Sequence, residues 1–419
     1  MNLLNLPQWK VLDVQESKHD YLVVAEPSVN LLACPHCQSK DLVRYGVRTP
    51  LFMHLPTHGK RVGIRAQAQR YRCGECRKIV QAPFPDIDER RRATEQLVRY
   101  VKKQSLLRPF TDVADEVGMH EKTVRRLFQE YVEELESAHK FVTPEWLGID
   151  EIHIKRTPRL VLTNIKEATV FNMLSTRKAE VVKRYFLSLP DKQQVKLVAI
   201  DMWKPYKLVI RATLPKAIIV VDKFHVVRLA NKALDDYRKD IREGLSAGDR
   251  RKLMHHRFIL LRRTKDLKAD EKLKLEMWRA ALPTLGVAYD LKEAFYSIYE
   301  SKDHHQAKRL YWDWLMSVPK DLEPYFRELI TALKNWETEI FAYFDHRITN
   351  AFTETVNNLT RKIESEGRGY SFDALRAKVL YTNGFKIEKR PKFGRLSRAE
   401  VNFGAPISTF IEQLEKGEI

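Results

Sequence analysis

The segment from Trp146 to Leu229 constrains the fold most strongly, because strand-like and helix-like hydrophobic periods succeed one another along it. Three short runs rich in β-branched and aromatic residues come first and are separated by brief turns, which predicts an antiparallel meander. Helical and buried-strand patterns then alternate, which predicts further strands joined by helices. The expected strands are 147–154, 160–165, 168–174, 195–200 and 217–221, and the expected helices are 178–189, 205–214 and one that follows the last strand through 239.

This order predicts a ribonuclease-H-like α/β core, in which the fourth strand lies beside the first. Asp150 lies within the first strand and Asp201 follows the fourth, so their side chains can converge at the crevice where open α/β sheets bind ligands. Glu151 is expected on the opposite face of its strand. Asp222 follows the fifth strand, one strand further out, and begins the tetrapeptide Asp222-Lys-Phe-His225. It is either a helix N-cap or an accessory residue that, with His225, orients a metal ligand or a DNA phosphate.

A third carboxylate comes from a helical segment much further along the chain. Four polar residues recur there at the spacing of one helical face: Asn350, Glu354, Asn357 and Arg361. A polar helical face is usually solvated, but a carboxylate flanked by asparagines and an arginine suits a site that still lacks one acid. Glu354 is therefore the expected third acid.

Phosphodiester cleavage requires stabilisation of the attacking and leaving oxygens, and two divalent ions held by carboxylates supply it without a protein nucleophile. We expect Asp150, Asp201 and Glu354 to be the catalytic acids and the ligands of two Mg²⁺ or Mn²⁺ ions. Asp222 and His225 are expected to be accessory, with Asp222 as the alternative second acid.

The chain has 419 residues and a formal net charge of +19, which favours a polyanionic partner. Charge alone leaves nucleic acids, membranes and ribosomes as alternatives. The length predicts two to four domains. The sequence has no signal-peptide pattern and no apolar run long enough to span a bilayer, so we expect a soluble cytoplasmic protein without a membrane partner.

The four cysteines form two C-x-x-C pairs within the first 80 residues: Cys34 with Cys37, and Cys73 with Cys76. Each pair is short enough for both thiolates to reach one tetrahedral Zn²⁺ ion, which predicts a zinc ribbon with one structural zinc. Two disulfides or four unrelated buried thiols are the alternatives, and a cytoplasmic location disfavours the disulfides.

A helix-turn-helix is predicted after a linker at 83–85. The expected helices cover 94–104, 111–117 and 120–135, with Thr111 as N-cap of the second and Gly118 in the turn. An ordinary helical hairpin with a solvated charged face is the alternative, but a preceding zinc ribbon and a basic chain favour DNA binding. The side chains expected at the major groove or its phosphates are His120, Lys122, Thr123, Arg125 and Arg126.

The remaining sequence completes the expected domain plan. A highly charged helical stretch without strand patterns interrupts the α/β core before the Glu354 helix, and a basic, poorly patterned segment ends the chain. The expected boundaries are 1–82 for the zinc ribbon, 83–140 for the helix-turn-helix, 141–240 for the first part of the core, 241–340 for an all-α insertion, 341–384 for the C-terminal part of the core, and 385–419 for a basic tail.

Together these motifs resemble the ISL-three family of insertion-sequence transposases over nearly the whole chain. The matching segments are Gly148-Ile-Asp150-Glu151, Ile200-Asp201-Met-Trp203-Lys-Pro-Tyr206, Val221-Asp222-Lys-Phe-His225-Val and Thr349-Asn350-Ala-Phe-Thr-Glu354-Thr-Val-Asn357. The resemblance implies a zinc ribbon, a helix-turn-helix and a DDE catalytic domain, with Asp150 and Glu354 as the first and last acids. The Asp-x-x-His element is similar to the Cys/Asp-x-x-His signature of Mutator-like and hAT-like transposases, which supports an accessory role for Asp222 and His225. Lys223 stands where arginine is common, and Thr349 and Thr355 stand where serine and glycine are expected.

The expected function is therefore that of a prokaryotic, nucleoid-associated DNA transposase. It would bind the terminal inverted repeats of an insertion sequence, cleave DNA with divalent metal ions, and join the freed 3′-hydroxyl to target DNA. Two element ends must be processed together, which implies a homodimer or a larger synaptic complex. The alternatives are a DNA-binding regulator derived from an inactive transposase and a structure-specific nuclease of the same fold.

Overall fold

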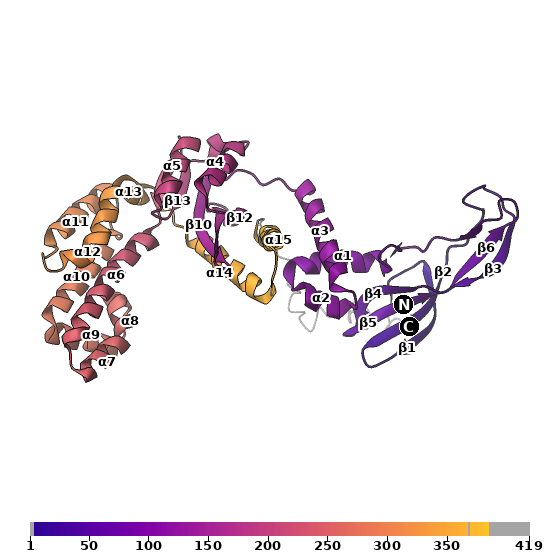
Figure 1. Ribbon diagram of the computed structural model, residues 1–419, viewed down its shortest axis with the longest axis horizontal. Helices are drawn as coiled ribbons and strands as arrows, with labels where there is room; N and C mark the ends of the chain where they lie inside the picture. The colour runs from indigo at the N-terminus through magenta and orange to yellow at the C-terminus, as the bar shows by residue number, and fades with distance from the viewer. Residues whose placement is uncertain (1–3, 368, 385–419) are drawn as a thin grey trace, which may run out of the picture. The chain divides into compact units, whose positions relative to one another are not determined.

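The computed structural model, which describes residues 4–367 and 369–384, contains a mixed sheet of five strands (Figure 1). Its strand order is β12-β11-β10-β13-β14. The first three strands in sequence pair antiparallel, whereas β13 and β14 run parallel to β10. The predicted meander and the predicted adjacency of the first and fourth strands are both confirmed. The strands are β10 (Trp146–Ile154), β11 (Thr157–Asn164), β12 (Thr169–Leu174), β13 (Leu197–Ile200) and β14 (Ile218–Val221).

Helices cover both faces of this sheet, and the alternation of side chains along β10 decides which residues each face receives. Leu147 and Ile149 belong to the core shared with α4 (Ala179–Ser188) and α5 (Lys204–Thr213). The side chain of Ile152 belongs to the core of the other face. That second face is covered by α14 (Ala351–Gly367) and α15 (Phe372–Asn383). A short 3-10 helix, Lys192–Gln194, precedes β13.

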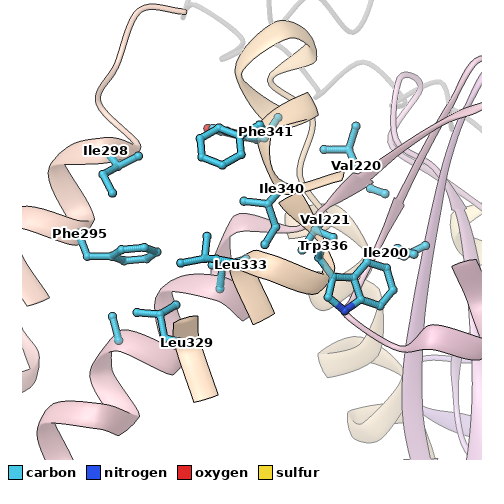
Figure 2. Close-up of a cluster of buried hydrophobic side chains, with 14 of the residues drawn as sticks. Ile200, Val220, Val221, Phe295, Ile298, Leu329, Leu333, Trp336, Ile340 and Phe341 are labelled. Atoms are coloured by element: carbon cyan, nitrogen blue, oxygen red, sulfur yellow. The ribbon is translucent and has the colours of Figure 1, made fainter. Parts of the chain in front are cut away.

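Helices alone fill the described chain between β14 and α14, as the sequence predicts for the insertion. Figure 2 shows Val220 and Val221 of the sheet close to Ile340 and Trp336 of the insertion, within one continuous buried cluster. The insertion is therefore anchored to the edge strand β14. The helices between β14 and α14 are α6 (Lys223–Ile241), α7 (Ala247–His255), α8 (Arg257–Leu261), α9 (Ala269–Ala281), α10 (Pro283–Ile298), α11 (His304–Ser317), α12 (Glu323–Asn335) and α13 (Glu337–His346), with 3-10 turns at Arg242–Gly244 and Thr264–Asp266.

Two separate sheets precede the helix-turn-helix, where the sequence predicts one small module. Strands β1 (Trp9–Glu16) and β2 (Asp20–Pro27) form an antiparallel hairpin, which continues into a six-stranded sheet of order β1-β2-β5-β4-β9-β8. A three-stranded sheet of order β3-β6-β7 carries the cysteines. The other strands are β3 (Leu42–Arg48), β4 (Leu51–Thr57), β5 (Lys60–Ala66), β6 (Ala68–Cys73), β7 (Ile79–Gln81), β8 (Ile87–Asp88) and β9 (Ala93–Thr94).

The segment 83–85, predicted to be a linker, is instead packed against the six-stranded sheet. Phe84 is buried and its ring lies 6.1 Å from that of Trp9 and 4.9 Å from that of Phe52. The indole of Trp9 donates a hydrogen bond of 2.9 Å to the carbonyl of Pro85. The prediction was wrong because the two prolines suggested a spacer, whereas the aromatic residue between them completes a hydrophobic core.

Three helices follow at the predicted positions: α1 (Glu95–Leu107), α2 (Phe110–Val117) and α3 (Glu121–Ala138). Gly118 ends α2 with a positive φ of 72°, which glycine adopts readily. Thr111 is not the N-cap of α2. The helix begins one residue earlier, at Phe110, with Pro109 at the cap position. The burial of Phe110 against Phe128, with 5.0 Å between ring centroids, accounts for the earlier start.

A buried lysine joins the helix-turn-helix to the α/β region. Lys378 of α15 is 1% exposed, and its ammonium donates to the carbonyls of Ser105 and Leu106 in the last turn of α1 and of Arg108 just beyond it. Cations are favourable at a helix C-terminus, where carbonyl groups lack helical partners. Separately, none of the described helices is both long and apolar enough to cross a membrane. The predicted basic tail, residues 385–419, lies outside the described residues.

Candidate active site

Asp150 lies on the face of β10 that α14 covers, and only 9% of it is exposed. Asn357 of α14 donates a hydrogen bond of 2.8 Å to Asp150 Oδ2, and the backbone N–H of Glu151 donates one of 2.8 Å to Oδ1. Glu151 itself binds the guanidinium of Arg177 at 2.7 Å. The predicted separation of the two neighbouring carboxylates onto opposite strand faces is confirmed.

Helix α14 approaches the sheet very closely at Gly148. A Cβ atom there would lie 2.4 Å from Thr163 Oγ1 and 2.6 Å from Thr353 Oγ1, so only glycine fits. The two threonine hydroxyls form a hydrogen bond of 2.7 Å between β11 and α14. Asn350, just before the helix, donates to the carbonyl of Ile149 at 2.8 Å. These buried contacts fix the first turn of α14, which carries Glu354, against the strand that carries Asp150.

The two candidates for the second acid follow neighbouring parallel strands, Asp201 after β13 and Asp222 after β14. Asp222 is completely buried, and neither of its carboxylate oxygens has a hydrogen-bond partner of normal geometry among the described residues, although the backbone N–H groups of Asn350 and Phe224 lower its pKa. It occupies the N-cap position of α6 but makes no capping hydrogen bond, which argues against the N-cap interpretation. Within the described residues, Oδ1 of Asp201 is likewise buried and has no hydrogen-bond partner.

The tightest grouping of acids differs from the predicted triad. Potential ligand atoms of Asp222, His225 and Glu354 all lie within 4.8 Å of one another. Within residues 4–367 and 369–384, no such group contains Asp150 or Asp201. Asp150 nevertheless lies close enough to Asp201, Glu354 and Asp222 for all three charges to raise its pKa. The structure therefore gathers the four carboxylates and His225 at one end of the sheet.

The pKa values of the three aspartates reflect their burial first and like-charged neighbours second, and for Asp201 the like-charged neighbour is Glu151. Burial raises the pKa of Asp150 to about 6, and the charges of Asp201, Glu354 and Asp222 add to the effect. Burial likewise raises the pKa of Asp201 to about 6, and that of Asp222 to about 6 with help from the charge of Glu354. Desolvated carboxylates with like-charged neighbours are costly unless a cation neutralises them. Carboxylate oxygens without donors are the ligands that Mg²⁺ and Mn²⁺ prefer, so this site fits a divalent ion.

The four cysteines meet at the end of the three-stranded sheet. Sγ of Cys34 lies 3.6 Å from that of Cys76, and Sγ of Cys37 lies 3.5 Å from that of Cys73. Four sulfurs placed about 2.3 Å from a tetrahedral centre lie about 3.8 Å apart, so the cluster fits one Zn²⁺ ion with a small expansion. Each close contact joins the two pairs, which is the arrangement a single shared ion requires.

The residues predicted to contact DNA lie on or just before α3, but they differ in solvent exposure and in their contacts within the protein. Lys122 and Arg126 are exposed, and Thr123 is half-buried. His120 is the N-cap, because its ring accepts a hydrogen bond of 3.1 Å from the backbone N–H of Lys122. The guanidinium of Arg125 pairs with Glu121 at 2.6 Å and lies 4.9 Å from the ring centre of Phe110.

Comparison with known families bears on this arrangement. A family model for the ISL3 transposases, described as "Transposase", matches residues 147–379, which is more than half of the chain and contains the sheet, the insertion and all four carboxylates. The chain belongs to the ISL3 transposase family. Two further models match its N-terminal part: "zinc-finger of transposase IS204/IS1001/IS1096/IS1165" over residues 31–76, and "Helix-turn-helix domain of transposase family ISL3" over residues 82–132.

Curated transposases of insertion sequences are similar to this member of the ISL3 family. The transposase for insertion sequence element IS1001 of Bordetella parapertussis is 24% identical over 365 residues, which cover 83% of this chain and 87% of the relative. The transposase for insertion sequence element IS1557 of Mycobacterium tuberculosis is 26% identical over 272 residues, which cover 58% of this chain and 61% of the relative. The zinc-ribbon model covers the cysteine cluster, which supports zinc as its ion.

Sequence reasoning missed two features of this ISL3 transposase. It placed Asn357 on the face of Glu354 but did not foresee that its amide binds Asp150. The sequence pattern also does not explain Gly148, which is required by the close approach of α14. A glycine inside an otherwise buried strand is a signal of close approach, and could have indicated it.

Proposed function

We propose that this protein binds the terminal inverted repeats of an insertion sequence and performs metal-dependent DNA cleavage and strand transfer at the carboxylate site. The observation that carries the proposal is the burial of both Asp222 oxygens and of Asp201 Oδ1 without hydrogen-bond partners of normal geometry among the described residues, beside the end of α14 that holds Glu354. Such an arrangement is unfavourable for folding by itself and becomes favourable when cations bind. A cation-dependent reaction explains why the chain maintains it.

Asp150, Asp201 and Glu354 are the proposed catalytic acids and would hold two Mg²⁺ or Mn²⁺ ions, with Asp222 and His225 beside them. The bound ions would stabilise the attacking and leaving oxygens of the phosphodiester. The protein's own contribution is to position the acids. Asn357 holds one oxygen of Asp150 towards α14 by a hydrogen bond from its amide. A ribonuclease-H-like core is the proposed fold of this region, supported by the strand order and the position of the acids.

DNA recognition is assigned to the N-terminal elements. The exposed side chains of Lys122 and Arg126 project from α3, which would lie in the major groove. Zinc would fix the loops of the three-stranded sheet, and the net charge of +19 would attract the DNA backbone. Processing of two ends together implies a homodimer or a larger synaptic complex as the active form.

Cleavage of labelled duplex DNA that carries the ends flanking the gene tests the proposal. We expect cleavage only with Mg²⁺ or Mn²⁺, and we expect Asp150→Asn, Asp201→Asn and Glu354→Gln to lower it at least about a thousandfold while end binding persists. Glu364→Gln, on the same helix as Glu354, is the matched control and should cleave normally.

The alternatives give different results in the same assay. A regulator derived from an inactive transposase would bind the ends tightly without cleaving them. A structure-specific nuclease would cleave branched DNA without regard to the end sequence. Either result would contradict the proposed function. Full cleavage by one of the acid variants would remove that acid from the site, and loss with Asp222→Asn but not Asp201→Asn would make Asp222 the second acid.

A further inference from the structure

We propose that Asp222, His225 and Glu354 form a mixed carboxylate–imidazole site that prefers a divalent transition-metal ion, such as Mn²⁺, to Mg²⁺. The inference rests on the proposed function and refines it: one of the two ions would lie in this site, and the other between Asp150 and Asp201. Asp222 and His225 would then be direct ligands rather than accessory residues.

The geometry of the three side chains suits one ion. Nε2 of His225 lies 4.0 Å from Oδ2 of Asp222. Ligand atoms about 2.1 Å from a shared ion can be at most about 4.2 Å apart, so this pair can bind the same ion. All three ligand atoms lie within 4.8 Å of one another, and Glu354 is exposed at its position on α14, so a small rotation of its side chain completes the set.

The state of Asp222 is an independent indication of a ligand. Its carboxylate is 0% exposed, and neither oxygen has a hydrogen-bond partner of normal geometry among the described residues. The backbone N–H groups of Asn350 and Phe224 face it and partly offset the rise in its pKa. A buried carboxylate without donors costs several kcal/mol unless a cation compensates it. A helix N-cap role leaves the carboxylate poorly satisfied, because Asp222 makes no side-chain capping bond of normal geometry to α6. The carboxylate instead faces His225 and Glu354.

The donor set decides which ion the site prefers. Mg²⁺ favours oxygen ligands and retains several waters, whereas imidazole nitrogen suits first-row transition metals. The position between Asp150 and Asp201 offers carboxylate oxygens from these two residues. The two positions should therefore differ in their preference between Mn²⁺ and Mg²⁺.

Arg228 contacts His225 and should affect how strongly this site binds an ion. Its guanidinium lies 3.2 Å from Nδ1 of His225. A guanidinium can only donate, so this contact selects the tautomer with the proton on Nε2. An ion at Nε2 requires the proton on Nδ1, so ion binding must displace the exposed Arg228 side chain. Arg228 therefore competes with the ion, and its removal should strengthen ion binding.

Binding of Mn²⁺ to the full-length, zinc-loaded protein tests the proposal, with free Mn²⁺ measured by electron paramagnetic resonance and Mg²⁺ added as competitor. The wild type should bind two Mn²⁺ ions, one of which Mg²⁺ displaces poorly. His225→Ala should weaken that ion about tenfold or more, as loss of a metal-site residue typically does. The exposed His305 provides the matched control, because His305→Ala should bind both ions as the wild type does.

Arg228→Ala keeps the test decisive if His225→Ala folds poorly, because it should tighten the Mg²⁺-resistant ion. Unchanged Mn²⁺ binding and Mg²⁺ competition in both His225→Ala and Arg228→Ala would overturn the inference. Its failure is distinct from failure of the proposed function. If the wild type cleaves element ends but Mn²⁺ binding is unchanged in His225→Ala and Arg228→Ala, only the mixed site is contradicted. If the wild type binds the ends without cleaving them, the proposed function is contradicted.

Discussion

Asn357 donates a hydrogen bond of 2.8 Å from Nδ2 to Oδ2 of Asp150, across 207 positions of sequence. This contact links the strand that carries the first proposed acid to the helix that carries the last one, Glu354. The amide of Asn357 is 3% exposed, so the bond is made in a region that excludes water. The relative position of the two acids depends on this buried contact.

Asn357→Ala should therefore lower the cleavage rate and the Mn²⁺ affinity by about 10–100-fold, the usual loss when a residue that orients a metal ligand is removed. Steady-state cleavage and Mn²⁺ titration are the measurements. Asn358→Ala is the control, because Asn358 is exposed and contacts only Arg361 among the described hydrogen bonds. Wild-type cleavage and Mn²⁺ affinity in Asn357→Ala would show that Asp150 needs no such support.

Gly148→Ala should destabilise the fold by about 1–3 kcal/mol, because its methyl group would overlap two threonine hydroxyls at 2.4 and 2.6 Å. It should also push α14 away from β10 and lower cleavage. Denaturant unfolding measures the first effect. Gly244→Ala adds the same methyl group where no heavy atom lies within 4 Å, and its stability should stay close to that of the wild type. Equal stability of the two variants would refute the close approach.

Removal of zinc should disorganise the cysteine-bearing sheet and weaken specific end binding. Cys34→Ser should reduce bound zinc from one ion per chain to nearly none, because a structural site depends on all four thiolates. Atomic absorption and gel-shift titration are the measurements. His36→Ala changes an exposed histidine beside the same cysteine pair and should retain zinc. Full zinc content in Cys34→Ser would be incompatible with a four-cysteine site.

Arg126→Ala should weaken DNA binding and reduce the salt dependence of log K by about one unit, as expected for loss of a phosphate contact. Arg125→Ala should have a smaller effect, because its guanidinium already pairs with Glu121 at 2.6 Å and lies over Phe110. Fluorescence anisotropy over a range of salt concentrations separates the two. A larger salt effect for Arg125 than for Arg126 would mean that the Glu121 pair opens on DNA.

Asp222 should make the protein less stable at neutral pH when Mg²⁺ and Mn²⁺ are absent. Burial raises its folded pKa to about 6, above the unfolded value of about 3.9. The folded state retains the proton that the unfolded state has lost, so stability falls as pH rises from about 4 to about 6 and remains lower above that. Asp222→Asn removes this loss and should raise stability at pH 8 by roughly 2–3 kcal/mol.

Thermal unfolding of Asp222→Asn at pH 4 and pH 8 measures the effect, which should be large only at pH 8. Asp236→Asn changes a more exposed aspartate on the same helix, with a side chain 41% exposed, and should show no comparable gain. A stability of Asp222→Asn that equals the wild type at pH 8 would mean that the buried carboxylate is compensated without a cation.

Local patterns in the sequence were sufficient to predict most of the helices and strands. Alternation along 147–154 predicted β10 and separated Glu151 from Asp150, because side chains of a strand point to alternate faces. The spacing within each C-x-x-C pair predicted the cysteine cluster, because two ligands on a tight turn must approach each other. Errors arose where a local signal competed with burial, as at Thr111 and at the segment 83–85.

The sequence by itself determined which residue types are available: two cysteine pairs, three acids at strand positions and one on a late helix. Only the tertiary structure decided how they combine. Asp222 and His225 are close in sequence, but Glu354 joins them because Asn350 and Asn357 hold α14 against β10 and Thr353 holds it against β11. Periodicity reports the face on which a residue lies, whereas strand order and long-range burial determine which faces meet. Local sequence patterns therefore cannot predict which side chains lie beside each acid, because the packing of distant segments determines this.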